Sequence, residues 1–159
     1  MNLKQLILGA FSCAIIFIVT AFIAVPVANL GYINLGDSII MLSAIILNPP
    51  LALLTAGIAS ASADIYLGFP QYAIFTFVIK GFEAFVVAYW MSKYKDKFPW
   101  VYLVAGLIVV LGYACADMII TQSIPAGFLS AGMNSIQASA AVVIAILLYK
   151  PFIALFKKM

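Results

Sequence analysis

Charged side chains are scarce in this sequence, and their scarcity restricts the class of protein. Only 8% of the 159 residues are charged, whereas 67% are hydrophobic. Soluble domains contain about 25% charged and about 45–50% apolar residues. This composition excludes a soluble enzyme, a nucleic-acid-binding module and a disordered tail. It predicts a protein that is embedded in the lipid bilayer over almost its whole length.

Histidine and arginine are missing altogether, and cysteine occurs only twice. Without histidine the chain lacks the usual ligand of zinc and haem, so we expect no metal site and no cofactor. Without arginine it has no bidentate guanidinium group to bind a phosphate or a carboxylate. Cys13 and Cys115 lie inside apolar runs and have no evident activating base, so we expect neither a disulfide nor an enzyme nucleophile.

A nucleotide-binding P-loop is also missing, since no GxxxxGK[ST] motif occurs in the sequence. If the protein transports a solute uphill, the energy must therefore come from an ion gradient or from a partner protein. The net charge of +3 comes from lysines near the ends of apolar runs, and it indicates no nucleic-acid partner.

Long apolar runs predict six membrane-spanning helices. The expected helices are residues 5–25, 33–47, 51–67, 72–91, 100–120 and 129–149. Lysines gather before the first run, between the fourth and the fifth, and after the sixth, so six spans place all three clusters and both termini in the cytoplasm. We therefore predict an all-α bundle of six transmembrane helices in the cell membrane, forming a single domain over residues 1–159.

Polar side chains concentrate in the half of the predicted bundle that lies away from the lysine clusters. Four of the five acidic residues lie there, together with Lys80 and several amide and aromatic residues. Because charged groups are costly inside a membrane, this concentration indicates a ligand pocket open to the outside. The candidate binding residues are Asn34, Asp37, Asp64, Phe69, Gln71, Tyr72, Phe75, Lys80, Glu83, Tyr113, Asp117, Asn134 and Gln137.

These polar groups also have structural interpretations. Lys80 and Glu83 are three residues apart on one helix face and could form a buried ion pair that holds helices in register. Asp37 and Asp117 could be polar groups at helix ends near the lipid headgroups, and Asp64 could pair with Lys80 or with the backbone. The aromatic residues could anchor loops at the membrane interface.

Small residues at four-residue spacing mark two of the predicted helices. Ala10 and Ala14 form such a step in the first helix, and Ala52, Ala56 and Ser60 do so in the third. Small residues let helix backbones approach closely. In the third helix the pattern favours packing within the bundle. In the first helix it fits either internal packing or a docking face for another membrane subunit.

The sequence resembles the substrate-binding S components of energy-coupling factor (ECF) vitamin transporters. Three stretches carry the likeness: residues 10–14 (AFSCA), residues 32–37 (YINLGD), and residues 64–83 with GFPQY at 68–72 and IKGFE at 79–83. The last two are similar to the branch that includes hydroxymethylpyrimidine, pyridoxine and riboflavin S components. The resemblance implies a six-helix bundle that binds one vitamin or precursor with high affinity in its outer half. It also implies a transmembrane coupling subunit that docks on Ala10 and Ala14, and two cytoplasmic ATPase subunits.

The residue types that the sequence lacks also restrict which vitamin the site could bind. Nickel and cobalt members of the family use an N-terminal histidine, which this chain does not have. The absence of arginine and the excess of acids argue against an anionic ligand and favour a neutral or cationic heteroaromatic ring. We therefore favour hydroxymethylpyrimidine or a vitamin B6 form, with riboflavin as a further candidate.

Two other functions are compatible with the sequence. The four outer acids could couple a secondary transporter of a small polar solute to a proton or sodium gradient. Such a transporter would work alone in liposomes, whereas an S component would need its partner ATPases. The third interpretation is a membrane scaffold or a small membrane enzyme that transports nothing.

Overall fold

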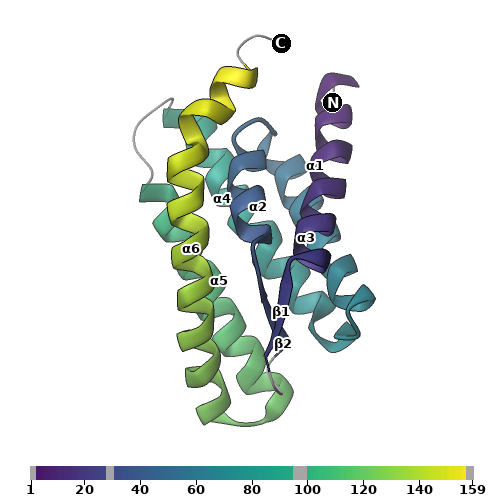
Figure 1. Ribbon diagram of the computed structural model, residues 1–159, viewed down its shortest axis with the longest axis vertical. Helices are drawn as coiled ribbons and strands as arrows, with labels where there is room; N and C mark the ends of the chain where they lie inside the picture. The colour runs from purple at the N-terminus through teal and green to yellow at the C-terminus, as the bar shows by residue number, and fades with distance from the viewer. Residues whose placement is uncertain (1–2, 28–30, 95–99, 157–159) are drawn as a thin grey trace.

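The computed structural model describes residues 3–27, 31–94 and 100–156 as a bundle of six α-helices with one β-hairpin (Figure 1). The hairpin pairs β1 (Ala24–Val27) with β2 (Gly31–Asn34) in antiparallel orientation. The helices are α1 (Leu3–Phe22), α2 (Gly36–Ala44), α3 (Pro49–Tyr66), α4 (Ala73–Tyr94), α5 (Trp100–Thr121) and α6 (Ile124–Phe156), with a 3₁₀ turn, η1 (Pro70–Tyr72), before α4. The prediction of an all-α bundle is therefore correct for the helices, but it missed the hairpin.

Four helical segments in the described part of the chain are long and apolar enough to cross a membrane. They are α1, the segment from η1 through α4, α5 and α6. Helix α3 has 18 residues, or about 27 Å at about 1.5 Å per residue, and α2 has 9 residues. The hydrocarbon core of a bilayer is about 30 Å thick, so α2 covers less than half of it. The chain is an integral membrane protein, and the count of six complete spans stays a prediction.

The helix ends that carry the described lysines of the predicted clusters lie together. The start of α1, the end of α4 and the end of α6 are at one end of the bundle, and the turn between α5 and α6 is at the other (Figure 1). Lys4, Lys93 and Lys150 lie in these three segments. The arrangement agrees with the side assignment made from the lysines, while the orientation in the membrane stays a prediction.

An Asn-Pro-Pro triplet at residues 48–50 begins α3. The side-chain oxygen of Asn48 accepts a hydrogen bond from the backbone N–H of Leu51 at 3.1 Å, and Pro49 and Pro50 occupy first-turn positions where no N–H is required. The backbone and side-chain amides of Asn48 both donate to Oε1 of Gln5 on α1. The cap of α3 is therefore also a contact with the start of α1.

Two predicted helix boundaries are wrong at the hairpin. Helix was predicted to residue 25 and again from residue 33, but Val25 and Ile33 face each other as strand partners. A short apolar run fits a strand as well as a helix, and strand pairing provides partners for the backbone amides and carbonyls. Helix α2 begins only at Gly36, whose N–H donates to Oδ1 of Asn34 at 2.7 Å.

Helix α6 is longer than the predicted 129–149. It begins at Ile124 and continues through Pro151 to Phe156. Pro125 is tolerated in the first turn of this helix because the N–H it lacks would have no helical partner there. The predicted outer loop between the last two helices is therefore reduced to a short turn.

Small residues bring α3 and α4 close together. A Cβ added to Gly57 would lie 2.8 Å from Cδ2 of Phe77, and one added to Gly81 would lie 3.2 Å from Cγ of Leu53. A side chain at Gly57 would therefore clash with Phe77, and one at Gly81 would require Leu53 to shift slightly. The small residues that were predicted to pack inside the bundle are buried, namely Ala52, Ala56 and Ser60.

Candidate functional site

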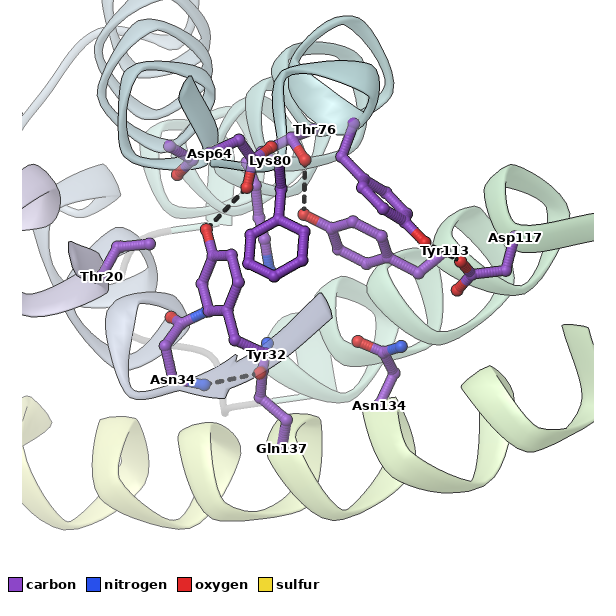
Figure 2. Close-up of a pocket in the computed structure, with 13 residues that line it drawn as sticks. Thr20, Tyr32, Asn34, Asp64, Thr76, Lys80, Tyr113, Asp117, Asn134 and Gln137 are labelled. Atoms are coloured by element: carbon purple, nitrogen blue, oxygen red, sulfur yellow. Dashed lines mark hydrogen bonds between the residues drawn. The ribbon is translucent and has the colours of Figure 1, made fainter. Parts of the chain in front are cut away.

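A cavity lies in the half of the bundle opposite the start of α1 and the end of α6. It is formed by the second halves of α1, α3 and α5, the first halves of α4 and α6, the turn that contains η1, and the β-hairpin (Figure 2). Its lining is almost entirely polar or aromatic: Thr20, Tyr32, Asn34, Ser60, Asp64, Phe69, Tyr72, Thr76, Lys80, Tyr113, Asp117, Asn134 and Gln137.

Lys80 provides the positive charge of this cavity. Its ammonium group forms an ion pair with Oδ1 of Asp37, and Oε2 of Glu83 lies 3.9 Å away. The second oxygen of Asp37 accepts a hydrogen bond from Nε2 of Gln137 at 2.8 Å. Nζ of Lys80 also lies 5.1 Å from the ring centre of Tyr113, within cation–π range. Lys80 is therefore held in place from three sides and presents little free charge to a ligand.

The β-hairpin is attached to two helices across the cavity. The backbone N–H of Asn34 donates to Oε1 of Gln137 on α6 at 2.8 Å. The hydroxyl of Tyr32 donates to Oδ1 of Asp64 on α3 at 2.6 Å. Burial and the neighbouring Asp64 carboxylate raise the pKa of Tyr32 well above its ordinary value. Tyr32 therefore stays protonated and remains a hydrogen-bond donor at physiological pH.

The end of α3 places an aromatic side chain beside the hairpin. Gly68 adopts a positive φ of 88°, and the N–H of Phe69 donates to the carbonyl of Asp64 at 2.8 Å. This is the Schellman arrangement, which turns the chain back over the last helical turn. The ring of Phe69 consequently lies 5.7 Å from the ring of Tyr32 and 6.4 Å from that of Tyr72.

Two further hydrogen bonds connect η1 and α4 with α5. The hydroxyl of Tyr72 donates to Oδ1 of Asp117, and the hydroxyls of Thr76 and Tyr113 lie 3.0 Å apart. In Figure 2, Thr20 and Asp117 lie at opposite ends of the site, with the rings of Tyr32 and Tyr113 between them. The site is therefore elongated, with polar groups at both ends and aromatic rings in the middle.

The cavity itself is small as the side chains lie. Its volume is about 40 Å³, which holds a few water molecules but not a heteroaromatic ring. A ring-sized ligand can be accommodated only if the aromatic side chains in the middle of the site move apart.

Most of the candidate residues predicted from the sequence meet at this cavity. Nine of them line it: Asn34, Asp64, Phe69, Tyr72, Lys80, Tyr113, Asp117, Asn134 and Gln137. Lys80 and Glu83 do come within ion-pair distance as the structural interpretation proposed, but the closer partner of Lys80 is Asp37 on another helix. Asp37 and Asp117 are buried, so neither is a helix-end group exposed at the headgroups.

The other four candidates do not line the cavity. Asp37 and Glu83 are fully buried beside Lys80. Gln71 has an exposed side chain in η1. Phe75 packs on a separate apolar cluster with Ile79 and other residues of α4 and α5. Asp37 and Glu83 were predicted from helix spacing, Gln71 from its place in the outer half and Phe75 as an aromatic wall. None of these signals reveals how the helices rotate against one another.

Sequence reasoning missed four lining residues: Thr20, Tyr32, Ser60 and Thr76. Three of them had a usable signal. Ser60 precedes Asp64 by one helical turn, and Thr76 precedes Lys80 by one turn, so each shares a face with a predicted residue. Tyr32 is two residues before Asn34 and shares its strand face. Thr20 had no such signal, because no candidate residue lies near it on α1.

Comparison with known proteins agrees with this architecture. Residues 1–153 match a family described as the ECF-type riboflavin transporter, S component. A protein of Pyrococcus woesei, described only as an uncharacterised protein in a gap 3′ region, is 34% identical over 132 residues, covering 80% of this chain and 86% of the relative. A solved S component of a bacterial ECF transporter superposes with a TM-score of 0.74 at 18% identity, covering 98% of both chains. This chain belongs to the family of ECF-type riboflavin transporter S components.

Proposed function

We propose that this chain is the high-affinity substrate-binding subunit of an ATP-driven ECF importer for a heteroaromatic vitamin, and that it is not an enzyme. The observation that carries the proposal is the elongated cavity, with aromatic rings between two polar ends, in the half of the bundle away from the lysine-bearing helix ends. With the lysines in the cytoplasm of the cell, the cavity faces the outside, where an importer meets its substrate.

The electrostatics of the site favour an uncharged or cationic ligand. Asp64 and Asp117 both line the cavity, and the charge of Lys80 is already paired with Asp37. An anion would be brought beside two carboxylates with no unpaired cation among the described lining residues. Phosphorylated vitamins are therefore disfavoured.

Riboflavin is the first vitamin to test, because the matching family is described as a riboflavin S component. It combines an uncharged aromatic ring system with a hydroxylated side chain, and this pairing suits a site with rings in the middle and polar groups at the ends. The preference for hydroxymethylpyrimidine or a vitamin B6 form, made from the sequence, stays a prediction and belongs in the same comparison.

The energy for transport would come from partner subunits. Ala10 and Ala14 are exposed on α1, on a face that also presents Ile7, Phe11 and Ile18. The alanine step therefore does not pack inside the bundle, and it leaves a shallow apolar strip open to another membrane protein. We propose that a transmembrane coupling subunit docks there and connects the chain to two cytoplasmic ATPases.

The direct test is a binding measurement on the detergent-purified chain. Riboflavin, hydroxymethylpyrimidine and pyridoxine are titrated separately, with quenching of flavin fluorescence for the first and calorimetry for all three. Saturable one-to-one binding of one of them supports the proposal and identifies the vitamin. Failure of all three, together with solute uptake by the chain alone in liposomes under a proton or sodium gradient, would favour the gradient-coupled transporter instead.

A further inference from the structure

Some of the buried polar atoms around the cavity lack a hydrogen-bond partner. In the described part of the chain, the unpartnered atoms that belong to lining residues are Oγ1 of Thr20, Oγ of Ser60 and Oδ2 of Asp64. Their residues are only 3%, 1% and 3% exposed. Buried polar groups are nearly always satisfied in folded proteins, so three such atoms on one cavity wall indicate that something else supplies their partners.

These three residues form one wall. Ser60 and Asp64 are one helical turn apart on α3, and Thr20 lies in the last turn of the neighbouring α1. Oδ1 of Asp64 is occupied by the hydroxyl of Tyr32. The hydroxyl of Thr76 on α4 is also close to the Asp64 carboxylate, but Oδ2 has no hydrogen bond of good geometry in the described chain and can still accept one.

Gly36 at the start of α2 makes room for the hydroxyl of Thr20. A Cβ at position 36 would collide with Oγ1 of Thr20 and would lie 2.7 Å from Oδ1 of Asn34. Any larger residue would therefore push the Thr20 hydroxyl away from its present place. The backbone of the hairpin and of α2 is thus shaped around an oxygen that bonds to nothing in the described chain.

On the opposite wall, each of three side chains has a protein partner for at least one of its polar atoms. Asp117 accepts from Tyr72, Tyr113 pairs with Thr76, and Asn134 donates to the carbonyl and hydroxyl of Ser130. Among the described lining residues, the unpartnered atoms that are fully shielded from solvent therefore lie on the α1–α3 wall.

We propose that Thr20, Ser60 and Asp64 form a subsite that binds the hydroxylated side chain of the substrate, a role that rests on the proposed function of this cavity. The chemistry of the three atoms decides the kind of group. Two hydroxyls each need both a donor and an acceptor, and a carboxylate oxygen needs a donor. Successive hydroxyl groups on a flexible chain supply both. An ammonium group supplies only donors and would leave the hydrogens of Thr20 and Ser60 without an acceptor.

The test compares two flavins on a small set of variants. Riboflavin carries a polyol side chain, and lumiflavin has the same ring system with a methyl group in its place. Thr20→Val and Ser60→Ala remove one hydroxyl each with little change of shape. Ser38→Ala is the matched control, because the Ser38 hydroxyl is also buried and unpartnered but does not line the cavity. A thermal-shift measurement on each variant reports whether it is folded.

The expected result is a loss of riboflavin affinity by about 5- to 20-fold in Thr20→Val and in Ser60→Ala, since each leaves a ligand hydroxyl unpaired in a buried site. Lumiflavin affinity should change by less than about twofold in the same variants, and Ser38→Ala should leave both ligands unaffected.

Two results would overturn the subsite while leaving the proposed function intact. One is unchanged riboflavin affinity in both variants, which would mean that the wall binds only water. The other is an equal loss for riboflavin and lumiflavin, which would show that the hydroxyls support the structure rather than the polyol. Wild-type protein that binds neither flavin would refute riboflavin as the substrate, and the polyol subsite with it.

Discussion

Asp37 and Glu83 flank the same buried lysine, yet the structure predicts a much larger loss of stability when Asp37 is neutralised than when Glu83 is. Asp37 forms the close ion pair with Lys80 and accepts from Gln137, whereas neither oxygen of Glu83 has a hydrogen-bond partner and its distance to Lys80 is 3.9 Å. Removing one partner of a buried ion pair costs about 3–5 kcal/mol, because the other charge stays buried. Asp37→Asn should therefore destabilise the protein by about that amount, and Glu83→Gln by less than about 1 kcal/mol.

The assay is thermal unfolding in detergent micelles, followed by tryptophan fluorescence. For a chain of this size about 1 kcal/mol corresponds to about 2–4 °C in Tm, so Asp37→Asn should lower Tm by roughly 10 °C and Glu83→Gln by less than about 4 °C. The double variant Asp37→Asn with Lys80→Met removes both charges and should recover much of the loss. A Glu83→Gln variant as unstable as Asp37→Asn would refute the assignment of Asp37 as the partner of Lys80.

Three further predictions follow from other parts of the molecule. Ala14→Trp fills the exposed strip on α1, so uptake by the assembled importer should be lost while ligand binding by the isolated chain is retained; loss of both would show that the strip packs within the chain. Asn48→Ala removes the cap of α3 and its contacts with Gln5, and thermal unfolding should show a loss of about 1–2 kcal/mol, with a value near zero contradicting the cap. Gly68→Ala places a side chain at a positive φ, which costs about 1 kcal/mol. The substitution should also displace Phe69 and thereby weaken ligand binding in a titration. Unchanged affinity would show that the Phe69 ring does not contribute to binding.

The sequence alone predicts the long helices well, because continuous apolar runs have few other interpretations in a chain of this composition. It also predicts which half of the bundle holds the cavity, because Asp64, Lys80 and Asp117 gather there and charged groups are costly inside a membrane. The hairpin could not be predicted, because the apolar residues on either side of position 28 fit a strand and a helix equally well. Strand pairing is decided by contacts between segments.

The division between lining and buried acids also lies beyond sequence reasoning. Asp37 and Asp64 have the same chemistry and similar distances from a helix end. The rotation of α2 and α3 within the bundle decides the difference. It directs Asp64 toward the cavity and places Asp37 beside Lys80, outside the cavity lining. Thr20 is the clearest case of this kind, because its role depends on a close approach to Gly36 that no local pattern indicates.

The attachment of the hairpin at both Tyr32 and Asn34 has a consequence for the speed of binding. The cavity is too small for a ring as it stands, so we expect a substrate to gain access while the aromatic side chains move apart and the Tyr32–Asp64 or Asn34–Gln137 hydrogen bond is broken. Association then proceeds through a minor open population and is slower than diffusional encounter. The same contacts re-form over a bound ligand and slow its escape. A long residence time, rather than rapid capture, would therefore be the kinetic basis of high affinity in this protein.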